Sequence, residues 1–250
     1  MSDLITVQGV VLSAMPVGEY DKRIVLLTRE RGKISAFAKG ARRQNSQFMA
    51  ASNPFVFGTF TLYEGRTSYN LSQVSVTHHF VELAGMQPGI YYGYYFLELA
   101  DYFGQEGTDE KESMNLLYVT VKALLNTHIS DRLVRCIFEL RMMAAQGLAP
   151  SLFHCICCDK EVGESDELFF SQANHGVLDR RCLGRVADAR RISWAALFVM
   201  EYIVTAPMGK LYTFTVTEEV LFEMERHIHT YVAENTDKKF KSLEILEMMV

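Results

Sequence analysis

The hydrophobic pattern of this 250-residue chain changes its period near residue 80. Before that point, apolar residues occur in short runs that alternate with polar ones, which is the period of half-buried β-strands. After it, apolar residues recur at helical spacing over longer segments. Strands followed by helices are typical of an α+β protein, and the sequence predicts two domains, 1–80 and 81–250.

The first domain contains five predicted strands. The connection between the third and fourth is longer than the others, polar and basic, and we expect a loop with a short helix there. Five short strands with this spacing favour a small Greek-key barrel, of which the OB-fold is the commonest. An SH3-like barrel or a small sandwich has a similar pattern. The predicted strands are 5–12, 22–28, 33–39, 55–63 and 67–77.

The second domain is predicted to be all-α, with one irregular insertion at about 151–187. Four Ser or Thr residues precede helical segments and are expected to act as N-caps, because their side-chain oxygens can accept a hydrogen bond from the first turn. They are Thr108, Ser130, Ser193 and Thr217. The predicted helices are 91–103, 109–126, 131–146, 194–205, 218–232 and 238–249.

Charge is distributed unevenly between the two domains. Residues 1–80 hold nine Lys or Arg and five Asp or Glu, a charge of +4, whereas the remainder holds 16 basic and 25 acidic residues, a charge of −9. A basic barrel can attract a polyanion. Lysines on edge strands also serve solubility, which is the alternative explanation. The candidate phosphate-binding residues are Lys22, Arg23, Arg29, Arg31, Lys33, Lys39, Arg42, Arg43 and Arg66.

Aromatic residues near these charges could stack on bases. The candidates are Phe37, Phe48, Tyr63 and Tyr69, and each of them could instead lie in the barrel core. For Phe37 we favour the core. Because no base-reading motif is present, we expect little sequence specificity.

Four of the five cysteines lie between residues 155 and 182. Cys155-x-x-Cys158 is followed, after twenty residues, by Asp179-x-x-Cys182, and two such pairs typically hold a tetrahedral zinc ion. The predicted ligands are Cys155, Cys158, Asp179 and Cys182, with His175 as an alternative fourth ligand. Such a site would be structural. A cluster that binds no metal is the other alternative.

Several functional classes lack their sequence signatures. No apolar stretch is long enough to span a membrane, and the N-terminus does not resemble a signal peptide, so we expect a cytoplasmic protein. Walker A, nucleophile-elbow and dinucleotide-binding motifs are absent, and we expect no catalysis. Two alternatives to DNA binding remain: a zinc-dependent enzyme acting on nucleotides or nucleic acid, and a scaffold that binds only proteins.

Several segments, in order along the chain, resemble the bacterial RecO family of recombination mediators. In the first domain they are 7–12 (VQGVVL), 19–25 (EYDKRIV), 31–34 (RGKI) and 39–43 (KGARR). In the second domain they are 138–141 (FELR), 147–150 (GLAP), 155–158 (CICC), 169–171 (FFS) and 175–178 (HGVL). The family usually has Cys at the position of Asp179 and Gly at that of His175, and some members lack the zinc cysteines.

The resemblance implies an N-terminal OB-fold and a helical domain with a zinc-ribbon-like insertion. It implies binding of single- and double-stranded DNA and annealing of complementary strands in the cytoplasm, in association with the nucleoid. It also implies two protein partners, RecR and the acidic C-terminal tail of single-stranded-DNA-binding protein (SSB), and a role in loading RecA onto SSB-coated DNA.

Overall fold

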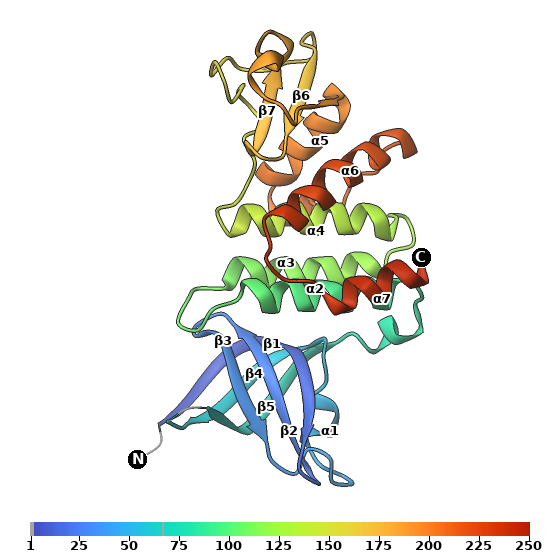
Figure 1. The fold of residues 1–250 in the computed structure, drawn as a ribbon. Helices are drawn as coiled ribbons and strands as arrows, with labels where there is room; N and C mark the ends of the chain where they lie inside the picture. Colours follow the sequence, from blue (N-terminus) through green and yellow to red (C-terminus); the bar gives the residue numbers. More distant parts are fainter. Residues whose placement is uncertain (1–2, 67) are drawn as a thin grey trace. The chain divides into compact units, whose positions relative to one another are not determined.

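The computed structural model describes residues 3–66 and 68–250, and Figure 1 shows its course. Met1, Ser2 and Thr67, the first residue of the fifth predicted strand, lie outside the described residues. The chain forms two compact units, one of residues 1–121 and 240–250 and the other of residues 122–239. Since the first unit includes helices beyond the strands, a domain boundary near residue 80 stays a prediction.

The five strands of the first unit form a closed barrel in the order β1-β2-β3-β5-β4, with β4 returning to β1. The long first strand pairs with β4 through its first half and with β2 through its second. Strands β3 and β5 pair in parallel, and the other pairs are antiparallel. This topology is that of an OB-fold, as predicted. The strands are β1 (Leu4–Val17), β2 (Asp21–Thr28), β3 (Gly32–Ala38), β4 (Val56–Glu64) and β5 (Tyr69–His79).

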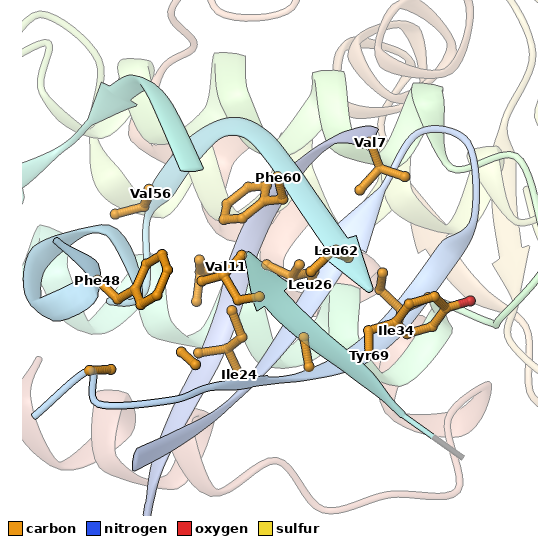
Figure 2. Packing of buried hydrophobic residues seen from close by; sticks show 14 residues of the cluster. Val7, Val11, Ile24, Leu26, Ile34, Phe48, Val56, Phe60, Leu62 and Tyr69 are labelled. Atoms are coloured by element: carbon orange, nitrogen blue, oxygen red, sulfur yellow. The ribbon is translucent and has the colours of Figure 1, made fainter. Parts of the chain in front are cut away.

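Alternation along the strands builds the barrel core. Ile34, Ala36 and Ala38 of β3 point inward, and the residues between them point outward. Figure 2 shows inward residues of all five strands packed into one cluster, with Phe48 of the short helix α1 (Phe48–Ala51) on one side. The connection between β3 and β4 therefore contains the expected short helix, and that helix contributes to the core.

Three further helices belong wholly or partly to the first unit. They are α2 (Gly89–Phe103), α3 (Lys111–Leu124), whose last turn passes into the second unit, and α7 (Lys241–Met249). A 3-10 helix, η1 (Val81–Gly85), leads from the barrel to α2. Helix α7 packs on α2, where Ser242 donates its backbone N–H to Glu98 Oε2 at 2.9 Å.

The second unit combines helices with a small sheet. Helices α4 (Asp131–Ala145), α5 (Trp194–Thr205) and α6 (Glu218–Glu234) pack together. The insertion and the residues directly after it form an antiparallel sheet in the order β7-β6-β8. Its strands are β6 (Leu168–Ser171) and β7 (Gly176–Asp179) of the insertion and β8 (Arg190–Ile192), which follows it. Short 3-10 helices follow β7 and α5, η2 (Arg180–Arg185) and η3 (Met208–Lys210).

Three of the four predicted N-caps are confirmed. Ser130, Ser193 and Thr217 each accept a backbone N–H of their helix. The prediction of Thr108 as a cap is wrong. Helix α3 begins at Lys111, whose N–H binds Asp109 Oδ1 at 3.0 Å. The Thr108 hydroxyl instead donates to the Gln105 carbonyl. None of the helices in the described part of the chain has the length and apolar character needed to cross a lipid bilayer.

Candidate nucleic-acid interface and metal centre

The nine predicted phosphate-binding residues form two groups, one at each end of the β2–β3 hairpin. One end lies at the β1–β2 turn and the other at the β2–β3 turn, and the length of β3 separates them by roughly 20 Å. The first end holds Lys22, Arg23, Lys39, Arg42 and Arg43, whereas Arg29, Arg31 and Lys33 lie at the second, together with Arg66 of the β4–β5 turn beside Glu64.

A glycine brings the loop after β3 back to the β1–β2 turn. Gly40 has a φ of +67°, a backbone conformation that residues with a side chain rarely adopt. Its N–H binds Asp21 Oδ1 at 2.7 Å, and the N–H of Arg42 binds the Tyr20 carbonyl at 2.8 Å. The Arg43 guanidinium lies 5.0 Å from the centre of the Tyr20 ring, a cation–π contact. Arg42, Arg43 and Tyr20, all exposed, are thereby placed together.

The outer face of β2 and β3 extends this group. Arg23 lies opposite Phe37 across the two strands, and its Nε donates to Ser35 Oγ at 2.7 Å. Phe37 points away from the core and is partly exposed, which corrects its expected burial. Lys39, exposed, follows two residues later. We call this group the basic surface. It consists of Arg23, Lys39, Arg42 and Arg43 with the aromatic residues Tyr20 and Phe37.

Three of the other predicted residues are engaged within the first unit. Lys22 donates to Asn53 Oδ1 at 2.8 Å and to the Met49 carbonyl, and burial together with Arg42 lowers its pKa. Arg31 lies 3.9 Å from Glu64, and Lys33 binds the carbonyl and carboxylate of Asp101. Arg29 and Arg66 are exposed.

The other aromatic candidates divide between core and surface. Phe48 and Tyr69 belong to the barrel core, whereas Tyr63 is 46% exposed. Tyr20, 43% exposed, was missed by sequence reasoning. Its position directly before Asp21, Lys22 and Arg23 was the available signal.

Two arginines of the second unit are placed differently. Arg132 makes a two-pronged contact with Glu225, through Nε at 2.8 Å and Nη2 at 2.6 Å, and Nη1 binds Glu218 at 2.9 Å. Arg135 binds Glu139 at 2.8 Å in the interior. These guanidinium groups are occupied by carboxylates of the same unit.

Three of the four predicted metal ligands lie together. The sulfurs of Cys155, Cys158 and Cys182 are within 4.8 Å of one another, and the three thiols are free. Three thiolates on one zinc ion at about 2.3 Å lie about 3.8 Å apart, so a small closure of the thiols would fit this ion. Burial raises the pKa of Cys155, but N–H groups of Asp179, Cys157 and Cys158 outweigh it and bring the pKa to about 7. Burial, and after it hydrogen bonds to Cys158 and Cys155, raise the pKa of the Cys182 thiol to about 12, so the thiols of this group do not ionise alike.

The two candidates for the fourth ligand are not in this group. Asp179 lies at the start of η2, and its carboxylate faces Arg181, whose hydrogen bonds hold the Asp179 pKa at about 2. His175 lies in the β6–β7 turn, at the opposite end of β7, with its ring 5.7 Å from that of Tyr231. Its φ of +54° is the left-handed conformation that favours glycine.

Comparison with known proteins assigns the family. Residues 1–80 match the model "Recombination protein O N terminal", and residues 89–244 match "Recombination protein O C terminal". The chain is similar to proteins named "DNA repair protein RecO". It is 31% identical to that of Symbiobacterium thermophilum over 249 residues (98% of each chain) and 28% identical to that of Acetivibrio thermocellus over 241 residues (96% of this chain, 95% of the other). With both family models matched along nearly its whole length, this chain belongs to the RecO family of DNA repair proteins.

Proposed function

We propose that this protein is a non-enzymatic recombination mediator that binds single- and double-stranded DNA and anneals complementary strands. The observation that supports this best is the basic surface. Its four cations lie against neutral groups or solvent on the outer face of β2 and β3 and the adjoining loop, and OB-folds bind oligonucleotides through this face. We expect little base specificity, because cations of this kind contact phosphates.

The physical basis of annealing needs no covalent step. Each phosphate contact releases condensed counterions from the DNA, so affinity comes largely from entropy and decreases with salt. Phe37 and Tyr20 offer ring faces on which unpaired bases can stack irrespective of sequence. Neutralising phosphate repulsion between two bound strands then allows them to pair.

Family membership supports the protein partners. We infer that the chain binds RecR and the acidic C-terminal tail of SSB, and helps to load RecA onto SSB-coated DNA, in the cytoplasm in association with the nucleoid. Because Arg132 and Arg135 bind glutamates of their own unit, we expect other cations to receive the acidic tail.

The first test is charge reversal in the basic surface. We expect R42E/R43E to weaken binding of a fluorescent single-stranded oligonucleotide at least about tenfold. The slope of log K against log salt should become shallower by about 1.4, or about 0.7 for each phosphate that is no longer neutralised. Fluorescence anisotropy at several salt concentrations measures both quantities.

The matched control is R29E, a reversal of an exposed arginine at the opposite end of the hairpin. We expect R29E to have a much smaller effect than one of the two reversals made singly. Equal losses of affinity in R29E and R42E would show that overall charge, and not the basic surface, governs binding.

The mediator role is tested by strand annealing on complementary oligonucleotides coated with SSB. We expect the wild-type protein to accelerate annealing and R42E/R43E to lose this acceleration. If the wild type binds DNA tightly but does not accelerate annealing, the DNA-binding part of the proposal stands and the annealing part is wrong.

A further inference from the structure

The carboxylate of Asp179, the first residue of the Asp-x-x-Cys pair, contacts cations and does not face the three thiols. Asp179 Oδ1 accepts the backbone N–H of Arg181 at 2.8 Å and its Nε at 3.0 Å, and Oδ2 accepts Nη2 at 3.0 Å. Lys160 Nζ lies 3.6 Å from Oδ2. Both carboxylate oxygens therefore already have cationic partners.

Turning this carboxylate toward a metal ion would break several contacts at once. Asp179 is 4% exposed and caps η2, so the change would remove a two-pronged arginine contact and the helix cap together. The position of Asp179 in the Asp-x-x-Cys pattern predicts a ligand, whereas its contacts make it a positioning residue for Arg181 and Lys160.

The remaining neighbours do not complete the group either. Among the described residues, the side chains close enough to share one ion are Cys155, Cys158 and Cys182, and Cys157 and His175 are not part of this group. Cys155 and Cys182 are buried, whereas Cys158 is exposed, so the cluster is open to solvent on the Cys158 side.

We propose that the cluster binds one zinc-type ion through three thiolates and leaves the fourth coordination position to an exchangeable small ligand from solvent. Zinc prefers four ligands, and water occupies the fourth position where the protein supplies three. The site therefore accepts a small thiol or imidazole as an added ligand. This inference does not depend on DNA binding.

Cobalt(II) is the probe, because its absorption reports the number of thiolates and the coordination geometry. We expect the wild-type full-length protein to bind one Co²⁺ with the sulfur-to-cobalt charge-transfer intensity of three thiolates. Added 2-mercaptoethanol should increase this intensity by about one-third, as a fourth thiolate would. C158S should lose at least about one-third of the intensity.

Two matched variants test the alternative fourth ligands. D179N keeps an oxygen that can cap η2, and C157S removes the neighbouring thiol outside the group. We expect both to bind one Co²⁺ with the wild-type spectrum. Loss of the tetrahedral d–d bands in D179N, with an unchanged far-UV circular dichroism spectrum, would assign the fourth position to Asp179 and overturn the proposal.

A reduced charge-transfer intensity in C157S would overturn the proposal, because it would make Cys157 a ligand. Failure of the wild type to bind Co²⁺, or to respond to the added thiol, would also overturn it. If D179N does not fold, the response of the wild type to the thiol still decides, because a site with four protein ligands has no free position.

Discussion

Three arginines of the barrel and two of the second unit carry the same charge in opposite surroundings. Arg23, Arg42 and Arg43 lie against a hydroxyl, a carbonyl and an aromatic ring. In the second unit, Arg132 and Arg135 bind carboxylates at hydrogen-bond distance. A guanidinium paired within its own chain contributes to stability, whereas one held by neutral groups keeps its charge for an external anion. We expect the two sets to respond to different experiments.

The largest effect is expected where a pair is buried. Glu139 is fully buried and binds Arg135, which is 9% exposed, so E139A removes the carboxylate that faces this guanidinium in the interior. We expect this change to lower the free energy of unfolding by about 3–5 kcal/mol. Urea unfolding followed by circular dichroism measures it. R42E/R43E is the control from the barrel, with an expected change within about 0.5 kcal/mol. Equal losses of stability in the two variants would remove the distinction between the two regions.

Phe37 separates stacking from charge within the basic surface. We expect F37A to weaken binding of single-stranded DNA by about 1–3 kcal/mol, because one base loses its aromatic partner. The salt slope should stay unchanged, since every phosphate remains neutralised. Anisotropy titrations at several salt concentrations measure both. F37W should retain wild-type affinity. If F37A binds DNA as tightly as the wild type, Phe37 does not stack on a base and only packs on the outside of the barrel.

Arg132 gives a smaller effect than Glu139, because its side chain is 38% exposed and solvent screens the interaction. We expect R132A to cost about 1–2 kcal/mol of unfolding free energy. R132K keeps the charge but loses the two-pronged geometry with Glu225, and we expect it to recover less than half of the loss. Thermal and urea unfolding provide the measurement. Full recovery by lysine would show that charge alone matters here.

Periodicity predicted the fold closely because the information is local. The five strands, the short helix in the 40–52 connection and three N-caps follow from alternation, turn residues and cap chemistry. Thr108 was misassigned because Asp109, one residue later, offers a carboxylate oxygen that accepts the N–H at the helix start. Phe37 was misassigned because its hydrophobicity suggested the core, although Ala36 and Ala38 on either side point inward.

The candidate site was less predictable because it depends on contacts between distant residues. Nine cations in sequence gave no indication that Lys33 would bind Asp101, 68 residues away, or that Arg43 would lie over Tyr20. The Cys-x-x-Cys and Asp-x-x-Cys spacings together identified the three clustered thiols. It did not show that Arg181 would bind the Asp179 carboxylate. Spacing indicates which residues are candidates, whereas competing partners decide which remain available.

The smallest effect is expected from pH. It should change the stability of the second unit but not DNA binding by the barrel. Burial, and after it the charge of Arg226, lowers the pKa of His227; Arg190 acts in the same direction, and the Arg191 carbonyl and Glu223 oppose it. Below the ordinary histidine pKa of about 6.5, the unfolded chain therefore takes up a proton that the folded chain does not, and stability decreases as pH falls.

We expect His227 to contribute a fraction of the maximum slope of about 1.4 kcal/mol per pH unit between pH 7 and 5.5. Urea unfolding at three pH values should show a smaller pH dependence in H227Q, whose amide N–H can replace the imidazole donor to the Arg191 carbonyl at 3.3 Å. Arginines and phosphodiesters do not titrate in this range, so DNA binding by the basic surface should be nearly constant. An identical pH dependence of stability in H227Q and the wild type would assign the titration to another group.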